Sequence, residues 1–467
     1  MTLLFRVLIW ILPVLTSVVP LWLSAQDDGI VVVGSIEING NKVTRPGIVL
    51  RELPFTSGDT LTQNQLALRL LEARENLLKL PLFHFVDIST SASATSAVRD
   101  VTVNLTERWY IWVWPVFDLS DRNFNSWLQQ GDFTRVSYGL FLQQENFRGR
   151  LEKLHVKIRL GYQQESSLLY ELPYLNKRKT TGAGMMLNYS RQRELGYLTV
   201  NNKLEYHRAD EFLMESLDAA FFLRLRPDIH FSHTWQAGFH RYAVSEKLLQ
   251  LNPEYTAGSA KLVRFAEFSY LLKADFRDQR SYPLAGIYAE GLVSQQLPFE
   301  KSDPAFFSVK LLLRGYIPLQ KKWNLAGSFA SRIVSAGELP FHLSRALGYG
   351  RDYVRGYEYY VVDGGDFAVA KINLRYCLLG PSVVNIRWLR ATQFNAVPYA
   401  VYPGVFLDGG RVWGIRKSPE NPLNGKFLAG AGLGVDFVTY YDKVFRVEYT
   451  LNAEGESGFF LHFMAAI

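Results

Sequence analysis

The sequence contains a single cysteine, Cys377, which excludes an internal disulfide and the class of small secreted domains held together by disulfides. After the first 25 residues it also lacks long apolar runs. A bundle of membrane-spanning helices is therefore excluded, because each helix would need about 20 consecutive apolar residues. Basic residues give a net charge of +7, but they form no cluster and accompany no nucleic-acid-binding motif. Nucleic acid is not an expected partner.

The sequence also lacks the residue patterns that are typical of catalytic and metal sites. The eight histidines are scattered, and neither G-x-S-x-G nor H-E-x-x-H occurs. Histidine, cysteine and carboxylate residues are not spaced as metal ligands. We therefore expect no enzyme activity, no bound metal and no cofactor.

Aromatic residues, in contrast, are abundant. Phe, Tyr and Trp make up 14% of the chain, yet the mean hydropathy is close to zero, at -0.03. This combination favours transmembrane β-strands, in which lipid-facing and lumen-facing residues alternate and the hydropathy averages out. A large soluble β-protein is the alternative that composition leaves open.

Residues 1–25 are predicted to form a secretory signal peptide. Arg6 is followed by an apolar stretch from Val7 to Leu23, and the segment ends at the small residue Ala25. A retained membrane anchor is the alternative. Export without a further helical span leaves the periplasm, the outer membrane or the medium as locations.

Residues 30–107 predict one compact α+β domain with the order β-α-α-β-β. Thr44 is expected to cap a short first helix that has Pro46 in its first turn. Thr62 and Gln65 have the spacing of a capping box, which predicts the start of a longer second helix. The apolar face of that helix is expected to comprise Leu66, Leu70, Ala73 and Leu77.

From Trp109 to the C-terminus the sequence predicts strands and turns without an amphipathic helix. Seventeen candidate strands can be delimited, whereas a bacterial single-chain barrel has an even number. The candidate near 198–207 has no apolar face and is assigned to an extracellular hairpin, which leaves sixteen. Strands near 367–379, 426–438 and 444–451 alternate apolar and polar residues, as expected for a lipid-facing exterior and a polar lumen. A soluble sandwich is the alternative, but the export signal and the strand number favour a barrel.

Residues 336–366 form a segment that is too long for a hairpin turn and is rich in glycine and tyrosine. It contains Val354-Arg355-Gly356-Tyr357. Long loops of this kind usually fold onto another part of the protein. Two further motifs are Phe406-Leu407-Asp408-Gly409-Gly410 and the D-x-R-x-x-P-x-x-G pattern at 278–286.

The order of these three motifs along the chain, 278–286, then 354–357, then 406–410, resembles that of a known superfamily. It comprises the outer-membrane assembly factors (BamA-like) and the two-partner secretion transporters, the bacterial surface antigen family. The unit at 30–107 resembles a single POTRA (polypeptide-transport-associated) domain, whereas family members commonly have two or more. The resemblance implies a periplasmic POTRA domain followed at 109–467 by a 16-stranded antiparallel transmembrane β-barrel. It also implies that the loop at 336–366 folds into the lumen and that the protein lies in the outer membrane of a Gram-negative-type bacterium.

The resemblance further implies an ion pair between Arg355 and Asp408, because the family's loop arginine pairs with the aspartate of the F-x-D-x-G motif, here Phe406, Asp408 and Gly410. Alternation independently places Asp408 in the lumen, since Leu407 falls on the lipid-facing side. A guanidinium gains most from a bidentate carboxylate in a confined site. Asp436 and Glu448 also point inward by alternation and are the alternative acidic partners.

As to function, the resemblance implies that the POTRA-like domain binds unfolded client polypeptides and that the barrel inserts them into the outer membrane or moves them across it. The implied partners are unfolded outer-membrane or exported proteins and outer-membrane lipid, and periplasmic accessory proteins are left open. Two alternatives are a two-partner-type secretion pore for one specific exported protein and a passive porin or structural barrel.

Overall fold

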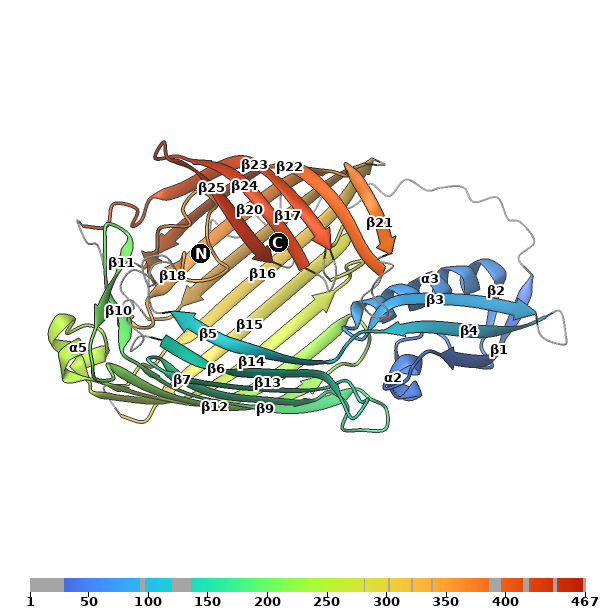
Figure 1. The fold of residues 1–467 in the computed structure, drawn as a ribbon, viewed down its shortest axis with the longest axis horizontal. Coiled ribbons are helices and arrows are strands. Elements are labelled where there is room, and N and C mark those ends of the chain that lie inside the picture. Colours follow the sequence, from blue (N-terminus) through green and yellow to red (C-terminus); the bar gives the residue numbers. More distant parts are fainter. Residues whose placement is uncertain are drawn as a thin grey trace.

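The structure, a computed structural model, describes residues 29–92, 97–119, 136–280, 282–300, 303–320, 322–336, 339–385, 396–414, 420–439 and 443–464. The predicted signal peptide at 1–25 lies outside these ranges. The chain folds into a small α+β domain followed by a closed antiparallel barrel (Figure 1), which is the fold class that the sequence predicts. No helix in the described part of the chain has the length and apolar character needed to cross a membrane.

The small domain is a four-stranded sheet with two helices. The strands lie in the order β2 (Thr60–Thr62), β1 (Ile30–Asn39), β4 (Val98–Glu107) and β3 (Phe83–Ala92), and the helices are α2 (Pro46–Arg51) and α3 (Gln63–Lys79). Strands β1 and β4 are parallel, and the other pairs are antiparallel. Strand β2 lies between the two helices and was not predicted, because three residues are too few to show alternation.

The predicted start of α3 is confirmed, whereas the predicted N-cap of α2 is wrong. Gln65 N donates to Thr62 Oγ1 at 3.2 Å and Thr62 N donates to Gln65 Oε1 at 3.0 Å, which is the predicted capping box. Arg45, not Thr44, is the N-cap of α2, and its side chain makes no capping hydrogen bond. Thr44 is buried, and its hydroxyl lies 3.1 Å from the Tyr110 hydroxyl.

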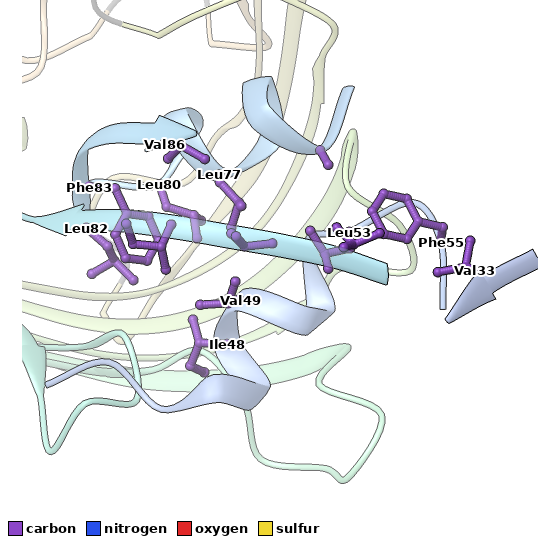
Figure 2. Close-up of a cluster of buried hydrophobic side chains, with 14 of the residues drawn as sticks. Val33, Ile48, Val49, Leu53, Phe55, Leu77, Leu80, Leu82, Phe83 and Val86 are labelled. Carbon is purple, nitrogen blue, oxygen red and sulfur yellow. The ribbon is translucent and has the colours of Figure 1, made fainter. Parts of the chain in front are cut away.

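The core of the small domain lies between the helices and the sheet. Leu66, Ala73 and Leu77 of α3 are buried, as the helical spacing predicts. Figure 2 shows Leu77, Leu80, Leu82, Phe83 and Val49 gathered in this core. Burying each such large apolar side chain contributes about 1.5–3 kcal/mol, which gives the domain its own hydrophobic core.

The barrel strands follow one another in chain order. They are β5 (Ile111–Leu119), β6 (Val136–Phe147), β7 (Glu152–Gly161), β8 (Gln164–Leu172), β9 (Thr181–Gln192), β12 (Met214–Leu225), β13 (Phe231–Val244), β14 (Leu262–Asp275), β15 (Gly286–Pro298), β16 (Phe307–Gln320), β17 (Trp323–Val334), β20 (Asp366–Tyr376), β21 (Leu379–Asn385), β22 (Ala396–Trp413), β23 (Phe427–Thr439), β24 (Lys443–Asn452) and β25 (Ser457–Met464). Strand β25 neighbours β5 and closes the barrel. Because β20 and β21 both pair with β22, they are two parts of one strand, and the described residues form the sixteen strands that the sequence predicts.

The candidate strand near 198–207 does not belong to the barrel. It is divided between β10 (Glu194–Val200) and β11 (Lys203–Arg208), which form a separate hairpin. Asn201 and Asn202 make the turn with φ of 51° and 57°, a conformation that asparagine tolerates well. This hairpin lies at the end of the barrel far from the small domain, together with α5 (Glu246–Leu251) (Figure 1), a short helix that the sequence analysis did not predict.

The predicted alternation along the strands is confirmed in β22. Val405 and Leu407 are 47% and 58% exposed, whereas Phe406 and Asp408 are buried inside the barrel. Strand β23 has the same pattern, with Phe427 and Leu433 exposed and Asp436 buried. The exterior of the barrel is therefore apolar and its interior polar, as expected of a barrel that contacts lipid.

Candidate functional site in the barrel lumen

The loop between β17 and β20 folds into the barrel. It contains the short antiparallel strands β18 (Arg345–Leu347) and β19 (Val362–Asp363). Val354 and Tyr357 are buried in a cluster that also contains Phe367 of β20 and Leu428 of β23. The loop is thus held against the inner wall by an apolar contact as well as by polar ones.

The tip of the loop is a tight turn at Gly356. Its φ is +92°, which side chains with a Cβ rarely adopt. Tyr357 N donates to Val354 O at 3.1 Å, and the Gly356 carbonyl accepts from Asn452 Nδ2 at 2.8 Å. This turn points Arg355 at the strands β22 and β24.

Arg355 and Asp408 lie together in a buried bidentate arrangement. Arg355 Nε and Nη2 donate to the two carboxylate oxygens of Asp408 at 2.8 and 2.5 Å, and the Arg355 backbone N–H donates to Oδ2 at 3.1 Å. The two side chains are 3% and 0% exposed. A charge-assisted pair of this geometry fixes both the position and the orientation of the loop tip.

Further groups complete the surroundings of Arg355. Its Nη1 donates to Glu448 Oε1 at 3.0 Å and to Asn373 Oδ1 at 2.7 Å. The guanidinium carbon lies 3.7 Å from the centroid of the Phe406 ring, close enough for a cation–π contact. Arg355 therefore contacts both Asp408 and Glu448, which the sequence offered as an alternative partner.

Asp436, the other alternative partner, lies in a second cluster and does not contact Arg355. It accepts hydrogen bonds from Arg446 Nε and Nη2 at 2.5 and 2.9 Å, and from the Tyr282 hydroxyl at 2.7 Å. Arg375 Nε lies 3.7 Å from Asp436 Oδ2. Tyr282 lies between β14 and β15, and its buried ring reaches the lumenal Asp436.

Sequence reasoning missed the roles of Tyr282, Asn373 and Arg446. Alternation already puts Asn373 and Arg446 on the inner faces of their strands, so an inward-facing polar residue was a usable signal for both. Nothing in the sequence indicates which inward residues meet, because that depends on the registers of β20, β22, β23 and β24.

Two glycines make room for the loop. A Cβ on Gly430 would lie 1.8 Å from the Arg355 carbonyl oxygen, and one on Gly410 would lie 2.8 Å from Val354 Cγ2. Because the first of these obstacles is backbone, it cannot turn aside as a flexible side chain could. The absence of a side chain at Gly410, the last residue of the F-x-D-x-G motif, thus allows the loop to pack closely against β22.

We expect Gly430→Ala to displace the loop tip and to destabilise the folded barrel by about 1–3 kcal/mol, the usual effect of overpacking. The measurement is the urea midpoint of the refolded protein, followed by its heat-dependent migration on gels. Gly291→Ala is the matched control, since nothing lies within 4 Å of a Cβ at that strand position. Equal midpoints for both variants would contradict the prediction.

The small domain is docked on one rim of the barrel through a buried charge. Glu52, at the end of α2, is 0% exposed and accepts from Arg226 Nη1 and Nη2 at 2.8 and 3.0 Å. Arg226 follows β12, and Tyr174, which follows β8, donates its hydroxyl to Glu52 Oε1 at 3.3 Å. Burial, together with the charge of Glu52, raises the pKa of Tyr174 to about 12, so this hydroxyl stays protonated and able to donate. Leu151 and Tyr174 also join the core of the small domain.

At the opposite end, the β10–β11 hairpin contacts the lumenal loop through hydrogen bonds between Asn202 and Val361, and beside this contact both line a cavity of about 680 Å³. Its lining includes Glu194 and Lys203 from the hairpin side, and Tyr349, Glu358 and Tyr359 from the loop. The loop is therefore accessible from this end of the barrel.

A closed barrel with an apolar exterior, an arginine-bearing loop in its lumen and a small α+β domain on its rim defines the class of outer-membrane barrels that carry a POTRA domain. The family models agree. Residues 146–440 match the Omp85 superfamily domain, and residues 31–108 match the surface antigen variable number repeat, a POTRA family. The chain therefore belongs to the Omp85 superfamily.

Solved structures show the same fold at low sequence identity. BamA from Haemophilus ducreyi lacking POTRA domains 1–3 is 18% identical, with a TM-score of 0.50 over 92% of this chain and 83% of that one. CdiB from Escherichia coli is 13% identical, with a TM-score of 0.53 over 93% of this chain and 74% of that one. Among curated protein sequences no match is found. Membership of the superfamily implies an outer-membrane location and a general role in protein insertion or secretion rather than an enzyme activity.

Proposed function

We propose that this protein binds unfolded client polypeptides through its POTRA domain and inserts them into the outer membrane or moves them across it. The observation that carries the proposal is the free edge of β3 on a domain that is fixed to the barrel rim. In the described residues β3 pairs with β4 alone, and its last four residues are exposed. An extended client can add a strand to such an edge through main-chain hydrogen bonds.

The docking of the domain supports this role. The Glu52–Arg226 pair and the Tyr174 contact fix the sheet beside the barrel end, which we assign to the periplasm. A client bound along β3 is thus held next to the barrel rather than on a flexible tether. Pro115 in β5, the neighbour of β25, has no N–H to donate, which weakens the seam where the first and last strands meet.

The test is the folding rate of an unfolded client barrel added to liposomes that contain this protein. We expect faster folding than in empty liposomes, and loss of that acceleration when residues 30–107 are deleted. If the full-length protein gave no acceleration, the proposal that it inserts client proteins into the membrane would be overturned. A secretion pore for a specific exported protein would then be favoured, ahead of a passive barrel.

Deletion of the domain also uncovers Leu151 and Tyr174, so a second pair of variants is needed. Ser89→Pro and Thr90→Pro each remove one N–H from β3, and successive N–H groups in a strand point to opposite sides. One variant therefore blocks the free edge, and the other weakens the ladder to β4. Client folding should slow in the edge variant without a matching loss of domain stability.

A further inference from the structure

A second group of polar side chains lies beside the arginine cluster and shares Glu448 with it. Glu358 follows the V-R-G-Y tip of the loop, Glu448 lies on β24, and His462 lies on β25. One ligand atom of each residue lies within 4.8 Å of the others. His462 Nε2 is 3.3 Å from Glu448 Oε2 and 3.9 Å from Glu358 Oε1.

These three atoms are buried, and none makes a hydrogen bond of good geometry in the described part of the chain, although His462 Nε2 and Glu448 Oε2 lie within ion-pair distance of each other. The Glu448 side chain is only 2% exposed, and water therefore has little access to its Oε2. This carboxylate oxygen lacks a hydrogen bond and lies close to Glu358 Oε1 and His462 Nε2. Buried polar atoms without partners are costly and uncommon, and three that converge on one point call for a common partner.

The remaining atoms of the two carboxylates are already engaged, which fixes the orientation of the free ones. Glu358 Oε2 accepts from the Gly356 N–H at 2.8 Å. Glu448 Oε1 accepts from Arg355 Nη1 at 3.0 Å and lies 3.8 Å from Arg446 Nε. The ring of His462 stacks on Tyr353, with centroids 6.1 Å apart.

We propose that Glu358, Glu448 and His462 form a binding site for a divalent transition-metal ion of the Zn²⁺ type. One imidazole nitrogen and two carboxylate oxygens are ligands that Zn²⁺ accepts, and water supplies the fourth position in sites of this composition. Ligand atoms around tetrahedral Zn²⁺ lie about 3.3–3.5 Å apart, so small side-chain movements close the observed spacing.

The position of the site determines how an ion can reach it and which elements a bound ion connects. Glu358 lines the 680 Å³ cavity at the end of the barrel opposite the POTRA domain, which gives an ion a route to the site. A bound ion ties the loop to β24 and to the last strand β25, which neighbours β5. The sequence analysis expected no metal site, because the three residues are far apart in the chain and show no ligand spacing.

The test is Zn²⁺ binding to the full-length protein, refolded in detergent with any histidine tag removed and then treated with a chelator. Equilibrium dialysis with Zn²⁺ followed by elemental analysis should give one ion per chain. Glu358→Gln and His462→Gln should each weaken binding by roughly 100-fold, because loss of a ligand costs at least as much as loss of a group that orients one. Co²⁺ in place of Zn²⁺ should give visible absorption bands that both variants lack.

His155→Gln is the matched control. His155 Nε2 lies 2.9 Å from Glu145 Oε1, and its side chain is 22% exposed against 16% for His462, but it has one carboxylate instead of two. Heat-dependent migration on gels shows whether each variant has folded. Wild-type protein that binds no Zn²⁺, or folded Glu358→Gln and His462→Gln proteins that bind it as tightly as the control, would overturn the proposal.

Discussion

Replacing Arg355 with alanine is expected to lower the free energy of unfolding of the barrel more than the loss of any one of its acidic partners. Asp408 and Glu448 are 0% and 2% exposed, and both lose a hydrogen-bonded cation in this variant. Removing one member of a fully buried ion pair costs about 3–5 kcal/mol. The lumenal loop should detach from the inner wall at the same time.

Asp408→Ala should be less damaging, because Arg355 keeps Glu448, Asn373 and the Phe406 ring. The Arg355→Ala, Asp408→Ala double variant should lose less stability than the sum of the single variants, since both remove the same interaction. Urea unfolding of the refolded proteins, with protease cleavage of the loop as a second readout, measures both effects.

Arg355→Lys is the informative conservative variant. Lysine keeps the charge but cannot form the fork of two parallel hydrogen bonds to Asp408, so it should restore only part of the stability. Full recovery by lysine would mean that the charge alone holds the loop. Unchanged stability of Arg355→Ala would show that the buried cluster contributes nothing to loop docking.

The second large effect is expected at the POTRA–barrel contact. Glu52→Gln removes the buried charge that lies between Arg51, Arg226 and Tyr174, and leaves two arginines without a carboxylate. The loss is expected to approach the 3–5 kcal/mol of a fully buried pair, reduced because the Arg226 side chain is 20% exposed and can reach water. The domain should then move relative to the barrel.

Spin-label distance measurement can detect this movement. Labels at Glu72→Cys in α3 and Lys177→Cys in the turn after β8, in a Cys377→Ser background, should give one narrow distance distribution for the otherwise unchanged protein. Glu52→Gln should broaden it, whereas Glu37→Gln, an exposed glutamate on β1, should not. A narrow distribution in both variants would show that the charge does not hold the domain.

Local patterns were sufficient to predict most of the elements. Strand patterns gave seventeen candidates, which the even strand number of such barrels reduced to sixteen. Alternation also gave the inner faces of β22 to β24, because a strand buries every second residue whatever its neighbours are. The capping box at Thr62 and Gln65 gave the start of α3, because both of its hydrogen bonds join residues three apart. Where local signals were short or ambiguous, the prediction failed: the three-residue β2 was not predicted, and the N-cap of α2 was placed at Thr44 instead of Arg45.

The sequence by itself therefore determined the domain order, the strand count and the inward direction of Arg355's acidic candidates. Only the tertiary structure decided that Glu448 shares Arg355 with Asp408 while Asp436 belongs to Arg446 and Tyr282. It also brought Glu52 against Arg226, and Glu358 against His462. These contacts depend on strand register and on how the loop and the domain pack, and both follow from the whole fold rather than from any local pattern.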